Sequence, residues 1–243
     1  MLSREYCMDL ISILIDWAPY LLTGIFVTLG LTAAGLGLGV IIGLPMAIGQ
    51  VYSTGIRWVD KIMKAFIAVF VWFFRGLPIL VLLFLFYFGI FPLLGMGDLA
   101  PFFVGAIVLG LRGAAYQSQI FRGAIQSISE GQMTAARSLG MTKLSAIKNV
   151  ILPQSFRIAL PGWSNEYPNI LTDSAVCYAI GVAELLTRSS QIASQTYEYT
   201  IYLVCAVLFI ILNYAGSKGL LILENRIAIP GFSGSGDEKQ VFL

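Results

Sequence analysis

Long apolar stretches separated by short polar segments dominate the pattern of this chain. A helix needs about 20 mostly apolar residues to cross a bilayer, and five stretches reach that length. They run near 20–48, 65–88, 101–125, 161–186 and 199–223. The fourth stretch is interrupted by Glu166, Pro168 and Asp173. The pattern predicts an all-α membrane protein with five transmembrane helices.

The two ends of the chain differ from this bundle. Residues 1–18 contain Asp9 and Asp16 within their apolar run, which is unlike a cleaved signal peptide and indicates a short N-terminal interfacial helix. Residues 231–243 are rich in Gly, Ser and charge and predict a flexible cytoplasmic tail. The membrane domain is therefore expected over 19–230.

The amino-acid composition is typical of a membrane protein and excludes several kinds of functional site. Hydrophobic residues make up 58% of the 243 positions and charged residues 12%, against about 25% charged residues in soluble domains. The net charge of +2 is too small to indicate a nucleic-acid partner. The absence of histidine removes imidazole bases and His-ligated metals, and three scattered cysteines indicate buried thiols. No bound metal or cofactor is expected.

Lys and Arg are concentrated in two of the loops between spans. These residues are Arg57, Lys61 and Lys64 after the first span and Arg122, Arg137, Lys143, Lys148 and Arg157 after the third. The loop after the second span has neither, and the loop after the fourth has Arg188 alone. Because cytoplasmic loops carry the excess of basic residues, the N-terminus is predicted outside and the C-terminus in the cytoplasm. No internal repeat is visible, so a translocation path is expected to need a second copy or a related subunit.

Several small or unusual residues in the spans are expected to have structural roles. Gly35, Gly39 and Gly43 form a stripe with four-residue spacing, which lets another helix approach closely. Pro45 is expected to bend the same helix. Glu184 is expected to be a solvated charge near the outer end of the fourth span, with a role as a gate as the alternative.

The polar segment 129–153 has the pattern of two short helices. Ser129 followed by Gln132 matches a capping box, from which a helix can run through Arg137. Gly140 then stands where a left-handed residue ends a helix. Thr142 is expected to cap the second helix.

The second of these helices is expected to bury one apolar side. That side consists of Leu144, Ile147 and Ile151. Pro153 is expected to break the helix before it and to begin the next element. The small residues Ala135 and Ala136 leave room for a partner surface, although a helix pair that rests on lipid headgroups is the alternative.

The spacing of Ala135-Ala136, Gly140 and Val150-x-Leu152-Pro153 resembles the EAA loop of ATP-binding-cassette (ABC) importer permeases. Thr134 stands where that family has Glu, and Val150 where it has Ile. The resemblance implies that segment 129–153 is the coupling loop on which the ATPase docks. The implied ATPase-coupling residues are Gln132, Thr134, Ala135, Ala136, Arg137, Gly140 and Pro153.

Further motifs narrow the resemblance to the polar amino acid permeases over about residues 17–230. They are Phe74-Arg75-Gly76-Leu77-Pro78, Ala115 to Gly123, Ile151 to Pro161, Asn165-Glu166, Asp173-Ser174 and Gly181 to Leu186. Three further departures from the family pattern touch the expected substrate path: Gln119, Thr172 and Pro168. The resemblance implies a type I ABC importer permease fold in a prokaryotic cell membrane. It also implies an ATPase subunit dimer that holds ATP and Mg, an external solute-binding protein, and alternating access.

Charged and polar residues at membrane depth are the candidates for binding substrate. A charge at the bilayer centre costs about 2.5–3.5 kcal/mol on insertion scales, so such groups face inward. The candidates are Arg75, Arg112, Tyr116, Gln119, Glu166 and Asp173. Arg75 is expected to hold the carboxylate of an amino acid through paired hydrogen bonds, and Glu166 or Asp173 its ammonium. The alternative is that these charges pair with one another as structural ion pairs.

A Walker A pattern is absent, so ATP hydrolysis is expected on a separate subunit. The sequence thus predicts the transmembrane subunit of an amino acid importer. A secondary, ion-coupled transporter or a channel is the alternative, in which the intramembrane acids would bind protons or sodium. A membrane-embedded enzyme is disfavoured because no nucleophile–base pair is present.

Overall fold

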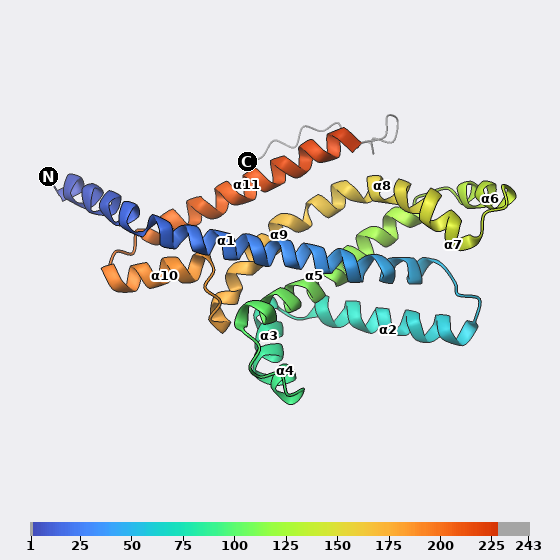
Figure 1. Ribbon diagram of the computed structural model, residues 1–243, viewed down its shortest axis with the longest axis horizontal. Helices are drawn as coiled ribbons and strands as arrows, with labels where there is room; N and C mark the ends of the chain where they lie inside the picture. The colour runs from blue at the N-terminus through green and yellow to red at the C-terminus, as the bar shows by residue number, and fades with distance from the viewer. Residues whose placement is uncertain (1, 228–243) are drawn as a thin grey trace.

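The computed structural model describes residues 2–227, with side chains described from Ser12 onward. Throughout this part of the chain the regular elements are helical, which confirms the predicted all-α class. They are α1 (Leu2–Val51), α2 (Arg57–Gly76), α3 (Ile79–Phe84), the π-helical turn η1 (Leu85–Ile90), α4 (Phe91–Leu93), α5 (Pro101–Gln126), α6 (Glu130–Ser138), α7 (Lys143–Ala146), the π-helical turn η2 (Ile147–Ile151), α8 (Leu152–Ser164), α9 (Glu166–Ser174), the 3₁₀ turn η3 (Ala175–Ile180), α10 (Leu185–Thr196) and α11 (Ile201–Ile227). Most of them run lengthwise along an elongated bundle (Figure 1). The tail 231–243 lies outside the described residues.

The most extensive contact in the bundle is between α1 and α5, where the glycine stripe lies. A Cβ atom on Gly39 would lie 2.1 Å from Nε2 of Gln117, and one on Gly43 would lie 2.9 Å from the carbonyl oxygen of Ala114. Only glycine permits this approach, so the stripe packs helices together as expected. Helix α1 continues without a break through Pro45, and the helix expected within 1–18 is continuous with it from Leu2.

The stretch 65–88, predicted as one span, is not a single straight helix, because the chain turns at Leu77–Pro78. Helix α2 ends at Gly76, and the segment Ile79–Leu93 is bent from it by 111°. Leu77 has φ −102° and ψ 140°, the extended conformation that a following proline favours. The motif that contains Arg75 therefore forms a corner, with Arg75 in the last turn of α2.

The predicted fourth span, 161–186, is not one straight helix but a series of helical elements. Consecutive helical elements run from Leu152 to Ile180 and end at Gly181, whose φ of +82° is left-handed. Glu184 is buried, and its carboxylate accepts hydrogen bonds of 2.7 Å from the backbone N–H groups of Leu186 and Thr187. Glu184 is thus the N-cap of α10, and the expectation of a solvated charge is wrong.

Helix length and hydropathy separate the elements that can cross a bilayer alone from those that depend on neighbours. Among the described residues, Ser12–Val51 and Ile201–Ile227 are each long and apolar enough. Counting each of two bent pairs, Arg57–Gly76 with Ile79–Leu93 and Glu166–Ile180 with Leu185–Thr196, as one span raises the number to four at most. Helix α5 is long but contains Arg112 and several other polar residues, and it packs against α1, α2, α8 and α9. Its polar residues Gln117 and Ser118 are buried against other helices, whereas Arg122 and Gln126 are exposed.

Candidate functional site

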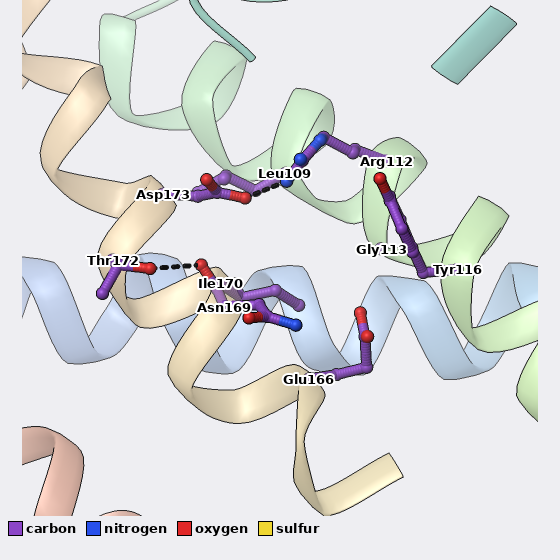
Figure 2. A pocket seen from close by; sticks show the side chains of 9 residues that line it. All are labelled: Leu109, Arg112, Gly113, Tyr116, Glu166, Asn169, Ile170, Thr172 and Asp173. Atoms are coloured by element: carbon purple, nitrogen blue, oxygen red, sulfur yellow. Dashed lines mark hydrogen bonds and ion pairs between the residues drawn. The ribbon is translucent and has the colours of Figure 1, made fainter. Parts of the chain in front are cut away.

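A cavity of about 240 Å³ lies between α5 and α9 (Figure 2). It is lined by Leu109, Arg112, Gly113, Tyr116, Glu166, Asn169, Ile170, Thr172 and Asp173. Four of the six residues predicted to bind substrate are in this wall. Helical spacing places Arg112 and Tyr116 one turn apart on α5, and Glu166 and Asp173 two turns apart on α9.

Arg112 and Asp173 form an ion pair across the cavity wall. The Nη1 group of Arg112 donates to Oδ2 of Asp173 (Figure 2), and the two side chains are 23% and 19% exposed. Structural ion pairs are the alternative to substrate binding for the charges at membrane depth, and Arg112 and Asp173 form such a pair. The pair joins α5 to α9 and neutralises two of the charges at membrane depth.

Arg75 approaches the same site from α2 without lining the cavity. Its guanidinium carbon lies 4.8 Å from the ring centroid of Tyr116, and that of Arg112 lies 5.2 Å from the same centroid. Cation–π contacts of this kind contribute about 0.5–1 kcal/mol at exposed sites. Arg75 is exposed and belongs to no ion pair within residues 12–227. The ring of Tyr116 therefore has a paired and an unpaired arginine next to it.

Glu166 is the buried acid of the cavity. Its side chain is 7% exposed, and it forms no ion pair in the described part of the chain. A buried carboxylate is costly unless a cation or hydrogen-bond donors compensate it. The side chain of Asn169 hydrogen-bonds to this carboxylate, and the positive charges of Arg112 and Arg75 act on it electrostatically.

Gln119 does not reach this cavity. It lies about 10 Å along α5 from Arg112, lines a second cavity of about 430 Å³, and donates a 3.1 Å hydrogen bond to Oγ of Ser118. The two residues share a helix face as predicted, but they lie at different depths. Helical periodicity predicts the direction in which a side chain points, but it does not predict which cavity along the helix axis the side chain reaches.

Two polar residues at this site had not been singled out for binding. Asn169 lines the cavity three residues after Glu166, and Thr172 lies one turn further along α9. Spacing from Glu166 was the available signal for Asn169. Gln117 is buried beside the site, where it accepts a 2.9 Å hydrogen bond from Nε1 of Trp163 and fixes α5 against α8.

The first half of segment 129–153 has the predicted helical geometry. Ser129 is the N-cap of α6, although its hydroxyl accepts from Gly131 N–H at 3.3 Å. Gly140 has φ +84°, as expected for the residue that ends this helix. The hydroxyl of Thr142 accepts from Ser145 N–H at 3.2 Å and caps α7.

The second half departs from the prediction in two ways. Leu144 is 75% exposed, whereas Ile147 and Ile151 are buried. Pro153 does not break the chain's helical course, because the π-helical turn Ile147–Ile151 leads directly into α8. The wider turn accommodates the missing proline N–H and rotates Leu144 away from the two isoleucines.

The predicted ATPase-coupling residues lie mostly on the surface of this hairpin. Gln132, Thr134, Ala135, Arg137, Gly140 and Pro153 are exposed, whereas Ala136 is 4% exposed and packs within the chain. Ala136 therefore leaves no room for a partner. Lys143 donates to the carbonyl oxygen of Ser53, and its Nζ atom lies 5.7 Å from the ring centroid of Tyr52. These contacts tie the hairpin to the turn between α1 and α2.

Comparison with known proteins shows which family the chain resembles. Residues 39–229 match the family described as binding-protein-dependent transport system inner membrane component. The chain belongs to this family. Membership confirms the predicted resemblance to ABC importer permeases. It also confirms a transport subunit rather than an enzyme, because members of the family work with a separate ATPase subunit.

Relatives of this inner membrane component cover most of the chain. It is 33% identical over 216 residues to the probable amino-acid ABC transporter permease protein YckA of Bacillus subtilis, which covers 88% of this chain and 92% of the relative. It is also 33% identical over 217 residues to the arginine ABC transporter permease protein ArtQ of Haemophilus influenzae, covering 87% and 95%.

A solved structure has the same fold. The crystal structure of an amino acid ABC transporter with histidines is 34% identical, with a TM-score of 0.76 over 88% of this chain and 96% of that one. The inner membrane component described here is thus an apolar, all-helical permease subunit. Its family implies an ATPase and a binding protein as partners.

Proposed function

We propose that this permease subunit carries a polar amino acid into the cell. The observation that supports this most directly is the charge arrangement around Tyr116. Because Arg112 and Asp173 neutralise each other, Arg75 and Glu166 are left as a separated cation and anion. A zwitterionic amino acid presents the complementary arrangement, with a carboxylate at one end and an ammonium at the other.

In this proposal each group of the site has one role. Arg75 holds the substrate carboxylate through two parallel hydrogen bonds, and Glu166 receives the ammonium. Tyr116, Asn169 and Thr172 provide neutral hydrogen-bonding groups. Arg112 and Asp173 keep α5 and α9 at the spacing that forms the cavity.

Transport is driven from the cytoplasmic hairpin formed by α6 and α7. An ATPase dimer grips this hairpin, and ATP binding draws two hairpins together, one from each permease subunit. The exposed residues Gln132, Thr134, Ala135 and Arg137 form the contact surface. Lys143 carries the movement to the α1–α2 turn through Ser53 and Tyr52.

The proposed arrangement in the membrane is a type I importer permease with five spans over 19–230. The spans are α1, α2, α5, the segment Leu152–Ile180 and α11. The N-terminus lies outside and the C-terminus in the cytoplasm. A second copy or a paralogue completes the path, and an external binding protein delivers the amino acid. The subunit alternates between outward-open and inward-open states.

Reconstitution tests this function. The complete transporter, with its ATPase and binding protein in vesicles, should accumulate a polar amino acid against its gradient only when ATP is supplied on the ATPase side. Accumulation by the permease without the ATPase, driven by a proton or sodium gradient, would instead establish the ion-coupled alternative.

A further inference from the structure

The second cavity, of about 430 Å³, lies at the end of the bundle where α1 leads into α2. Its wall consists of Gln50, Lys64, Ile67, Ala68, Val71, Trp72, Gln119 and Arg122. These residues come from α1, α2 and α5. None of them lines the cavity that contains Glu166, so the two sites are separate.

One end of this cavity is cationic and has unused hydrogen-bond donors. Lys64 and Arg122 take part in no ion pair within residues 12–227. The Nε2 atom of Gln50 is buried and has no hydrogen-bond partner in the same part of the chain. A buried amide donor without a partner is unfavourable, so a ligand that accepts from it would be stabilised.

Asp60 interacts electrostatically with Lys64 but forms no ion pair with it. The carboxylate of Asp60 lies one turn before Lys64 on α2, and it accepts hydrogen bonds from Ser53 and Thr54. The Lys64 ammonium therefore remains available to an anion.

The other end of the cavity is apolar and follows α2 away from the charges. Ile67, Ala68, Val71 and Trp72 recur at helical spacing on one face. From Lys64 to Trp72 this face is about 12 Å long. Free phosphate would gain nothing from such a wall, and a polar amino acid would lose hydration against it. An amphipathic anion suits both ends.

We propose that this cavity binds an anionic phospholipid of the cytoplasmic leaflet. Its phosphate lies between Lys64 and Arg122, the Gln50 amide donates to a phosphate or ester oxygen, and one acyl chain runs along Ile67 to Trp72. Basic pockets between membrane helices on the cytoplasmic side bind anionic headgroups in this way. The inference rests on the proposed orientation of the chain and is independent of the substrate.

Native mass spectrometry of the complete transporter tests the proposal. Phosphatidylglycerol and phosphatidylcholine with the same acyl chains are titrated onto delipidated complex. The wild type should bind phosphatidylglycerol about 10- to 30-fold more tightly, because each cation near a headgroup contributes about 1 kcal/mol. Lys64→Gln with Arg122→Gln should abolish this preference. The matched double variant Lys148→Gln with Arg157→Gln removes the same charge from exposed positions elsewhere and should keep it.

A further variant and a competitor separate the lipid from a free anion. Ala68→Phe fills the apolar wall without changing the charge and should weaken phosphatidylglycerol binding, whereas excess inorganic phosphate should not displace the lipid. Equal affinity for the two lipids, an unchanged preference in the Lys64/Arg122 variant, or displacement by inorganic phosphate would each overturn the proposal. Uptake of amino acid by the same variants is measured in parallel, so a failure here is distinct from a failure of the transport function.

Discussion

Arg112 and Asp173 form an ion pair that joins α5 to α9 at the wall of the first cavity. Because Arg112 and Asp173 pair with each other, they are less available to a ligand than the charged residues without an ion pair. The pairing leaves Arg75, which lies against the ring of Tyr116, and Glu166, which lines the same cavity as Tyr116, outside any ion pair in the described part of the chain. In the proposed function, these two groups are the ones that bind the opposite ends of a zwitterionic amino acid.

Replacing Arg75 by alanine should lower ATP-dependent amino acid uptake at least about tenfold. A hydrogen bond to a charged group contributes about 1.5–3 kcal/mol, and the substrate carboxylate would lose its partner. Because the Arg75 side chain is exposed, the complex should still assemble. Uptake into vesicles and size-exclusion chromatography of the same preparation measure the two effects.

The control for Arg75 is Arg157→Ala, which removes an exposed arginine from α8, away from the cavity. This variant should transport normally. Normal uptake by Arg75→Ala as well would exclude Arg75 as the carboxylate ligand.

Replacing Asp173 by asparagine should destabilise the permease by about 1–3 kcal/mol, because it leaves the Arg112 guanidinium without its partner. Adding Arg112→Gln should recover much of this loss, since the unpaired charge is then gone. Denaturant unfolding of the wild type, both single variants and the double variant gives the coupling energy. Strictly additive single effects would show that the pair contributes nothing to stability.

Helical spacing in the sequence predicted the pairs of polar residues that each of α5 and α9 contributes to the cavity wall. Arg112 with Tyr116 and Glu166 with Asp173 each repeat at a helical interval, and a polar group in a membrane helix has to face protein. The same periodicity carries no information on position along the helix axis, and Gln119 lines the second cavity instead of the first. Pairing between α5 and α9 is a tertiary contact, so the choice between an ion pair and free charges stayed open.

Local backbone chemistry predicted the hairpin better than the spans. Gly140 and Thr142 have the roles that their residue types favour, because a left-handed turn and an N-cap depend on one residue and its neighbours. The corner at Leu77–Pro78 was missed because apolar residues continue on both sides of it. A hydropathy average over about 20 residues does not detect such a corner. Pro78 was the signal in the sequence that could have indicated it.

Replacing Gly39 by alanine should destabilise the bundle by about 1–3 kcal/mol. The new Cβ would lie 2.1 Å from Nε2 of Gln117, and the displaced amide would strain its hydrogen bond with Trp163. Gly37→Ala is the matched control, since nothing lies within 4 Å of a Cβ at that position. It should be neutral or slightly stabilising, because alanine favours helix. Thermal unfolding in detergent compares the two, and equal midpoints would contradict the close α1–α5 packing.

Reversing the charge of Arg137 and replacing Gly140 by leucine should uncouple ATP hydrolysis from transport. Gly140 has φ +84°, a conformation that costs a side chain such as leucine about 1–2 kcal/mol, so the end of α6 would shift. Arg137 is exposed on the same hairpin and donates at 3.3 Å to the carbonyl oxygen of Met141. In vesicles, ATPase activity should persist or rise while uptake falls.

Gly140→Asn is the control that adds a side chain at this position without excluding the left-handed backbone conformation. Asparagine tolerates the left-handed conformation, so Gly140→Asn should keep the hairpin in place and preserve most uptake. A hairpin that merely rests on lipid headgroups would predict the opposite pattern: the Arg137→Glu, Gly140→Leu variant would transport at the wild-type rate per ATP hydrolysed. That result would remove the docking role from segment 129–153, and the ATPase would have to contact another surface of the permease subunit.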